Sequence, residues 1–311
     1  MISDKMMQAV RYHQFGGSDV LQLEQIPRPV PQAGEVLVRI VAAGVLPIDW
    51  KIRKGLIPMP VQFPYIPGTA LAGIVEEVGA DVTGFQKGQA VFGRSTKGTY
   101  AEYTTVPVDS LAHKPRSIRF DEAATLSGGA TTAWRAIVSD GGVKAGDRVL
   151  VHGAAGGVGL FAVQFAKWKG AHVIGTAGPA NIEFIQSLGA ETAIDYTTTS
   201  FEQVVQEVDF VLDTIGGETL DRSWPVVRRG GSLVSIAGQL PMEKAHELGI
   251  RAMRSSLATS QDLADIAQLI DEGVVKTFIE RTFSISEAKQ AHEWSQRGHG
   301  RGRIVLRISE E

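Results

Sequence analysis

A glycine-rich turn is the segment of this sequence whose residue types and spacing most directly suggest chemistry. Gly153, Gly156 and Gly159 recur at intervals of three inside the stretch RVLVHGAAGGVGLFAVQFAKWKGAHVIGTA, residues 148–177. Glycines let a backbone turn sharply and let a pyrophosphate approach without a Cβ in the way. The flanking apolar runs predict a strand before the turn and a helix after it, whose free N–H groups face that phosphate. The pattern predicts a dinucleotide-binding turn, with a tight turn that binds nothing as the alternative.

The end of the next predicted strand bears on the choice of cofactor. In NAD-binding units a carboxylate about 20 residues after the glycines holds the ribose hydroxyls, and Ala177 stands at that place here. A missing carboxylate leaves room for a 2′-phosphate and removes a contact to NAD, so the sequence favours NADPH. No basic residue follows within 178–181. Arg301 or Arg303 could supply the cation, and the alternative is that both are solvated surface charges.

Strands and helices must alternate around this turn to position it, and the chain after residue 123 has that alternation. Apolar runs predict strands over 148–152, 171–175, 192–196, 208–213 and 232–236. Helical patterns lie between them over 158–169, 181–188, 201–207 and about 220–227. The predicted fold class is therefore α/β, with a doubly wound parallel sheet of the Rossmann type.

Before residue 123, short strand-like runs are separated by glycine and proline, which is typical of an antiparallel or mixed barrel. Predicted strands there are 35–45, 72–78, 90–93 and 99–106, and four prolines exclude a helix from 55–67. Near the C-terminus we predict a helix over 260–272, a capping box of Ser284 and Glu287 that starts another, and a strand over 303–308. We infer that this segment returns to the first domain. The predicted domains are 1–122 with 273–311, and 123–272.

The composition excludes several other kinds of chemistry. The 311 residues suffice for two domains and include no cysteine, which excludes disulfides, thiolate catalysis and cysteine-containing zinc sites. The formal net charge of −3 argues against nucleic acid or an anionic membrane as a general partner, although it does not exclude a local basic patch. Neither a secretory signal nor an apolar run of about 20 residues is present. We therefore expect a cytoplasmic protein without a membrane partner.

Six motifs together carry a resemblance to a known family. They are GTALAGIVEEVG (68–79), GTYAEYTTVP (98–107), LSGGATTAW (126–134), HGAAGGVG (152–159), LGAETAIDY (188–196) and GHGRGRIVL (298–306). The chain resembles the zinc-free medium-chain dehydrogenase/reductase superfamily, and within it the NADPH:quinone oxidoreductase branch. The resemblance implies a GroES-like β-barrel domain into which a Rossmann domain is inserted. It also implies a homodimer that pairs through edge strands of the Rossmann domains.

The resemblance also implies which residues bind the cofactor. Thr132 matches a contact to the nicotinamide amide, with a hydroxyl bonded to its own helix backbone as the alternative. Tyr196 matches a residue on the adenosine side, unless it only caps a strand end. The other matching positions are Ala155, Gly156, Gly157 and Val158 at the pyrophosphate, Thr176 at the adenosine, and Thr214, Ile236, Ala237 and Gly238 beside the ribose and nicotinamide.

Two departures from related sequences concern metal and substrate. Zinc-dependent members of the superfamily have Cys where this sequence has Leu46, and His-Glu where it has Thr69-Ala70, so the resemblance implies no metal site. Quinone reductases usually have Asn at the position of Leu46. The loss of that amide bears on nicotinamide positioning and on substrate preference.

Asp49 and Lys51 are the candidate catalytic residues, for proton supply or substrate orientation, and a surface ion pair is the alternative. Trp50, Tyr65 and Trp134 could line an aromatic slot or simply pack in a core. The resemblance implies hydride transfer from NADPH to a quinone or similar electrophilic carbonyl. The alternatives are an NADPH-dependent alkenal or enone double-bond reductase, a low-turnover NADPH-binding redox sensor, and an enoyl reductase for acyl thioesters.

Overall fold

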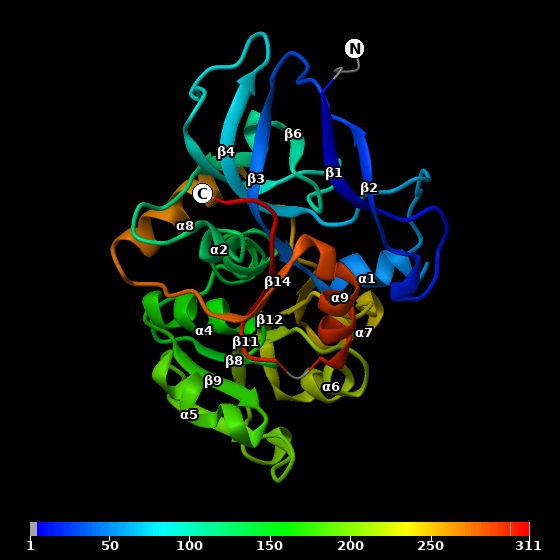
Figure 1. Ribbon diagram of the computed structural model, residues 1–311. Coiled ribbons are helices and arrows are strands. Elements are labelled where there is room, and N and C mark those ends of the chain that lie inside the picture. Colours follow the sequence, from blue (N-terminus) through cyan, green and yellow to red (C-terminus); the bar gives the residue numbers. More distant parts are fainter. Residues whose placement is uncertain (1–4, 299, 311) are drawn as a thin grey trace. The chain divides into compact units, whose positions relative to one another are not determined.

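The structure is a computed structural model that describes residues 5–298 and 300–310, and its contacts divide the chain into two compact units (Figure 1). Unit 1 contains the residues up to Gly128, Thr259–Gly273 and the residues from Thr277 onward. Unit 2 contains Gly129–Ala258 and Val274–Lys276. Each unit is built around its own sheet, and each contains some of the residues that the sequence analysis singled out.

Unit 2 is a parallel six-stranded sheet in the order β10-β9-β8-β11-β12-β13. The strands are β8 (Arg148–Val151), β9 (His172–Ala177), β10 (Thr192–Asp195), β11 (Val208–Asp213), β12 (Val227–Ser235) and β13 (Arg251–Met253). The helices are α3 (Thr131–Trp134), α4 (Gly159–Trp168), α5 (Ile182–Ser187), α6 (Gly217–Ser223) and α7 (Met242–Leu248). Numbered from β8, the order is 3-2-1-4-5-6, which is the Rossmann topology, so the predicted fold class is confirmed.

The strands of unit 2 carry apolar residues on both faces, as a covered parallel sheet requires. Leu150 of β8 and Val211 of β11 pack in one cluster with Leu220 and Trp224 of the α6 segment, while α4 packs against β8 and β9. Figure 1 draws α4 and α6 on different sides of these strands. The strand order reverses between β8 and β11, so a ligand crevice is expected at their carboxyl ends.

Unit 1 is a mostly antiparallel sheet in the order β14-β15-β3-β4-β5-β7, with β6 paired to β3 and a separate β1-β2 pair. Its strands are β1 (Met6–Arg11), β2 (Gln22–Pro27), β3 (Glu35–Val45), β4 (Ala70–Val78), β5 (Ala90–Arg94), β6 (Tyr103–Pro107), β7 (Leu111–His113), β14 (Ile279–Ser284) and β15 (Arg303–Arg307). Its helices are α1 (Pro47–Arg53), α2 (Phe120–Ala123), α8 (Ser260–Asp271) and α9 (Ala288–Arg297). Val36, Val38 and Ile40, which alternate along β3, share one apolar cluster.

The C-terminal segment returns to the unit that holds the N-terminal strands, as inferred, because β15 pairs antiparallel with β3. The capping box of Ser284 and Glu287 is also present, ahead of α9. Helix α8 differs from its predicted place in the second domain. It packs against β7, and its Asp271 accepts hydrogen bonds from the backbone and hydroxyl of Ser117, so it belongs to unit 1.

Tertiary packing overrides the local pattern in two places in unit 2. The helix predicted over 201–207 is only a short 3-10 turn, Phe201–Gln203. Phe201 and Val205 both enter the core, and Glu207 has a φ of 54°, which no helix continues through. The helix expected near 220–227 ends at Ser223, because Pro225 lacks the N–H that a further turn needs. Helix α7 and strand β13 were not predicted.

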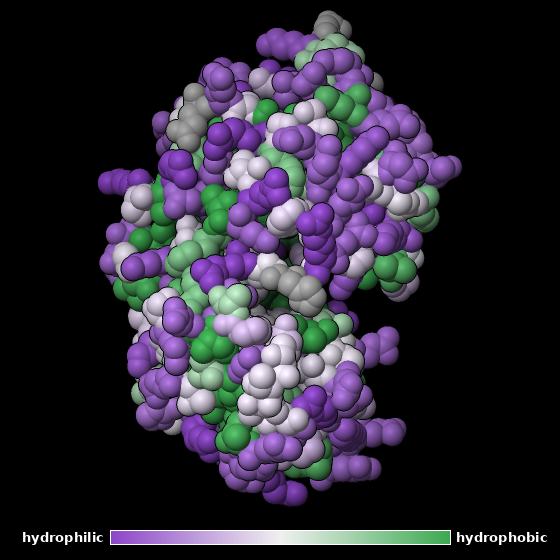
Figure 2. Space-filling model, turned by 60° about the horizontal axis from the view of Figure 1, so that its bottom comes forward, coloured by the Kyte–Doolittle hydropathy of each residue, from purple (hydrophilic) through white to green (hydrophobic). Residues whose placement is uncertain are grey.

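One face of the molecule is predominantly hydrophilic. Figure 2 shows one face on which hydrophilic residues dominate and apolar residues occur in small groups. Across 5–298 and 300–310, no helix combines the length and hydropathy that crossing a bilayer demands.

Candidate functional site

The glycine-rich turn joins the carboxyl end of β8 to the start of α4. Gly153 has a φ of 64°, and a Cβ there would come within 2.5 Å of the Thr214 hydroxyl oxygen. A Cβ on Gly159 would lie 2.2 Å from the Gly153 carbonyl oxygen, so only glycine lets α4 pack this closely on the turn. A Cβ on Gly156 would meet only that carbonyl, at 3.2 Å. The backbone is therefore approachable at Gly156, which fits a pyrophosphate at the N-terminus of α4.

His152, directly before the turn, organises the carboxyl ends of β8 and β9. Its ring nitrogens lie 3.1 Å from the Thr176 hydroxyl oxygen and 3.0 Å from that of Ser223. Burial lowers the pKa of His152 to about 4, so the imidazole is neutral near pH 7. Thr176 was expected to line the adenosine. It is buried, and its hydroxyl contacts His152, which makes it a support for the turn; its contact to the adenosine stays a prediction.

The ends of β11 and β12 are fixed by a buried carboxylate that the sequence did not single out. Asp213 accepts hydrogen bonds from the Ser235 hydroxyl at 2.6 Å and from the backbone N–H groups of Ile215 and Gly216 at 3.1 and 2.9 Å. The Thr214 hydroxyl donates to the His152 carbonyl at 2.8 Å. The predicted residues Ile236, Ala237 and Gly238 follow β12, and the last two donate backbone N–H groups to the Ser235 hydroxyl at 3.3 and 3.0 Å.

The residues predicted for the ribose and adenosine side meet at the ends of β9 and β10. The Tyr196 N–H donates to the Ala177 carbonyl at 3.2 Å, and a Cβ on Gly178 would lie 3.4 Å from the Tyr196 hydroxyl oxygen. Tyr196 is 53% exposed, whereas Ala177 is buried. A ligand could therefore reach the aromatic ring of Tyr196, while Ala177 presents only its backbone and a covered methyl group.

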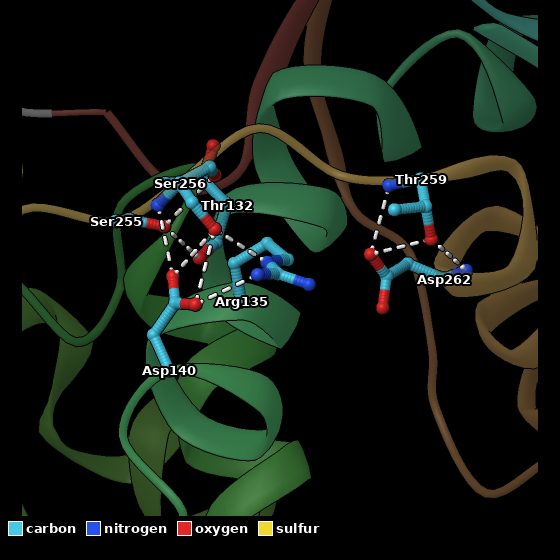
Figure 3. Close-up of polar contacts among 7 residues, drawn as sticks. All are labelled: Thr132, Arg135, Asp140, Ser255, Ser256, Thr259 and Asp262. Atoms are coloured by element: carbon cyan, nitrogen blue, oxygen red, sulfur yellow. Dashed lines mark hydrogen bonds and ion pairs between the residues drawn. The ribbon is translucent and has the colours of Figure 1, made fainter. Parts of the chain in front are cut away.

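Thr132 of α3 is held by the loop that follows β13. The Ser255 hydroxyl donates to the Thr132 carbonyl at 3.3 Å, and the Ser256 N–H donates to Asp140 at 2.8 Å (Figure 3). Arg135 forms an ion pair with Asp140 at 2.7 Å and donates to the Ser256 hydroxyl at 2.7 Å. This network, which the sequence did not predict, fixes the α3 segment against the carboxyl end of β13.

Unit 1 holds the candidate catalytic residues on the short helix α1. Asp49 is buried and accepts hydrogen bonds from the Leu46 N–H at 2.8 Å and from the Tyr100 hydroxyl at 3.2 Å. Lys51 does not pair with it, and its Nζ lies 5.6 Å from the centre of the Trp50 ring. The alternative of a surface ion pair between Asp49 and Lys51 is therefore wrong, because the carboxylate points into the core.

A buried polar cluster surrounds Asp49, and the sequence did not reveal it. His292 Nε2 lies 3.2 Å from the Tyr100 hydroxyl oxygen. Burial raises the pKa of Asp49 from 3.8 to about 7, against the opposing effects of its hydrogen bonds from Leu46 and Tyr100 and the charge of Arg303. Burial also lowers the pKa of His292 to about 3. The surroundings of Asp49 therefore disfavour the ionised form of its carboxyl group.

The two arginines considered as partners of a 2′-phosphate both lie in unit 1. Arg303 is not a solvated surface charge: it is buried, it donates to the Gly128 carbonyl, and burial lowers its pKa to about 10. Arg301 is exposed, and its role at the phosphate stays a prediction.

Trp50, Tyr65 and Trp134 were considered for an aromatic slot. Of these three, Trp134 is a core residue, since it is buried against Phe165 with ring centres 5.3 Å apart.

Comparison with known proteins shows which family this chain belongs to. Family models described as the alcohol dehydrogenase GroES-like domain and as zinc-binding dehydrogenase match residues 32–116 and 188–306. The quinone oxidoreductase of Mus musculus is 33% identical over 97% of this chain and 98% of its own. The chain belongs to the quinone oxidoreductase branch of the medium-chain dehydrogenase/reductase superfamily.

Two further members of this branch match over nearly their full length. The chloroplast envelope quinone oxidoreductase homolog of Arabidopsis thaliana is 32% identical, with 98% of this chain and 99% of that protein covered. The solved quinone oxidoreductase from Coxiella burnetii has a TM-score of 0.91 and 33% identity, with 98% of this chain and 100% of that chain covered.

One of the matching family models is named for zinc binding. The side chains of this protein at the corresponding positions do not fit a zinc ion. Leu46 is buried, and a Cβ on Gly128 would lie 2.6 Å from its side chain, which shows how closely it packs there. Ala70 is buried within β4 and offers only a methyl group. In the part of the chain that the structure describes, no three His, Cys, Asp or Glu side chains are grouped to hold a metal ion.

Gly156→Ala tests the phosphate turn. The added methyl group meets only one carbonyl oxygen of the free protein, at 3.2 Å, but it occupies the side from which a phosphate would approach. We expect the fold to persist and the dissociation constant for NADPH to rise about tenfold or more, measured by fluorescence titration. Unchanged affinity, with an unchanged far-UV circular dichroism spectrum, would contradict this placement of the pyrophosphate.

Asp49→Asn tests the buried carboxyl group. The folded-state pKa of Asp49 lies above its ordinary value, so the folded protein binds this proton more tightly than the unfolded chain. Stability from this group is then lost as pH rises from about 4 to about 7. As the pH rises from about 5 to about 8, the unfolding free energy of the parent should therefore fall by about 2–3 kcal/mol relative to that of the Asn variant. Denaturant unfolding of both proteins measures this, and a difference that does not change with pH would refute the raised pKa.

Proposed function

We propose that this protein is an NADPH-dependent, zinc-independent oxidoreductase that transfers a hydride to a quinone or a similar electrophilic carbonyl. The observation that carries the proposal is the glycine turn at the reversal of strand order in unit 2, where Gly156 leaves the backbone approachable. Alkyl side chains at Leu46 and Ala70 support a reaction without a Lewis acid. Ala177, in place of a carboxylate, favours NADPH over NADH.

The cofactor, when bound, supplies the hydride; the chain supplies its binding and orientation. Gly156 and Gly157 would let the pyrophosphate approach the backbone at the positive end of the α4 dipole. The exposed ring of Tyr196 would contact the adenosine. Thr132, held by the loop after β13, and the segment 236–238, held by Ser235, would orient the nicotinamide end.

The two candidate catalytic residues have different roles in this proposal. Asp49 is a positioning residue, because its carboxylate is buried and holds the first turn of α1 through the Leu46 N–H. Lys51 carries a cation that has no ion-pair partner among the described residues and would orient the substrate carbonyl. Protonation of the reduced quinone would come from solvent.

Two further features complete the proposal. Among the residues that the structure describes, strand β13 pairs only with β12, so it offers an edge through which two copies would form a homodimer. The absence of cysteine from the sequence fits a reducing compartment, and we propose the cytoplasm.

Steady-state turnover tests the function. Metal-stripped protein should oxidise NADPH in the presence of benzoquinone or phenanthrenequinone, more efficiently than NADH, and a chelator should leave the rate unchanged. Absorbance at the NADPH band measures this. Turnover only with an enone would replace the proposal by a double-bond reductase. Tight NADPH binding without turnover on any quinone, enone or acyl thioester would replace it by a sensor.

A further inference from the structure

The last residue of β10 carries a charge beside the position where an NAD-binding unit would have its ribose-binding acid. Asp195 pairs with Ala177 in the parallel register of β10 and β9, and each is the last residue of its strand. Neighbouring strands lie about 4.8 Å apart, and residues paired across them project from the same face of the sheet. The carboxylate that is missing at residue 177 therefore has a counterpart one strand further out.

The two oxygens of the Asp195 carboxylate differ in their contacts. Oδ1 accepts hydrogen bonds from the Thr197 N–H at 2.9 Å and from the Thr197 hydroxyl at 2.7 Å. Across 5–298 and 300–310, Oδ2 receives no hydrogen bond and the carboxylate has no ion pair. Asp195 is only half-buried, so one oxygen and the negative charge are open to a ligand.

The residues predicted to contact the adenosine lie at these same strand ends. The Tyr196 N–H donates to the Ala177 carbonyl at 3.2 Å, and the Tyr196 hydroxyl oxygen lies 3.4 Å from where a Cβ on Gly178 would be. The segments that leave the two strands, 178–181 and 195–200, contain no Lys, Arg or His, and Asp195 is their only charged residue. The charge next to the adenosine side of unit 2 is therefore negative.

We infer that Asp195 reads the 2′ position of the adenosine ribose and limits the preference for NADPH. Its carboxylate accepts a hydrogen bond from the 2′-hydroxyl of NADH and repels the 2′-phosphate of NADPH. Ala177 and Asp195 thus act in opposite directions on the choice of cofactor. This assignment rests on the proposed function, because it takes the dinucleotide to bind at the carboxyl ends of β8, β9 and β10.

Asp195→Asn separates the charge from the turn. The amide oxygen of Asn still accepts both hydrogen bonds from Thr197, so the loop after β10 should persist, which far-UV circular dichroism checks. Fluorescence titration of the full chain then gives dissociation constants for NADPH and NADH. Two unit charges about 4 Å apart in water repel by an amount that changes affinity about fivefold. We expect the variant to bind NADPH about fivefold more tightly, and to bind NADH with about the same affinity as the parent.

A second readout is the dependence on salt. Ions screen the repulsion between exposed charges, so the gain in NADPH affinity from Asp195→Asn should shrink as the ionic strength rises. A carboxylate that only shaped the loop would give no such dependence of the difference between variant and parent.

Asp147→Asn is the matched control. Asp147 also accepts a backbone N–H, from Lys144 at 2.8 Å, but it directly precedes β8 and so lies at the amino end of that strand. The control changes the net charge by the same amount as Asp195→Asn, at the opposite edge of the sheet. It should leave both dissociation constants unchanged.

The ratio of the NADPH and NADH dissociation constants decides the outcome. The same ratio in the parent and in Asp195→Asn would overturn the inference, even if both cofactors bind more weakly, and so would an equal shift in the control. A parent that binds NADH but not NADPH would contradict the proposed cofactor, whereas a gain of NADPH binding by the variant would still support the role of Asp195. A parent that binds neither dinucleotide would overturn both.

Discussion

The close approach of Gly159 to the Gly153 carbonyl is the contact on which unit 2 depends. A methyl group on Gly159 would be 2.2 Å from that oxygen and 2.8 Å from the Cα of Ala154, far inside contact distance. The first turn of α4 can therefore pack on the turn that follows β8 only if residue 159 is glycine. Because α4 begins there, the positive end of its dipole lies where the strand order reverses.

Buried polar groups then fix the ends of the strands around that turn. Asp213 accepts three hydrogen bonds and holds the loops after β11 and β12, while His152 links β8, β9 and α6 through two hydroxyl groups. Such groups are stable in a core only when they are satisfied. In unit 1, Asp49 accepts hydrogen bonds from the Leu46 N–H and the Tyr100 hydroxyl, but burial still raises its pKa, so this carboxyl group retains its proton more readily.

The features that could be predicted from the sequence are those that depend on residues close together in the chain. The glycine turn, the strand β11 and the capping box before α9 follow from spacing and side-chain type, and the structure has them. The cluster around Asp49 could not be predicted in this way. Its members Tyr100 and His292 lie 192 residues apart, and only the pairing of β15 with β3 brings the C-terminal segment back to this unit.

The same limit explains the wrong expectations. A helical pattern over 201–207 yields to the burial of Phe201 and Val205 in the core. The alternative that Arg303 is a solvated surface charge is wrong because this residue begins β15 and is buried, which the short apolar run after it did not reveal.

Single-turnover oxidation of NADPH deuterated at C4 tests most directly whether this turn delivers a hydride without metal. Metal-stripped protein is mixed with the labelled or unlabelled cofactor and phenanthrenequinone in a stopped-flow instrument. The account predicts oxidation of both, slowed by deuterium, at a rate that added zinc does not change. Oxidation that disappears with the metal and returns with zinc would contradict it.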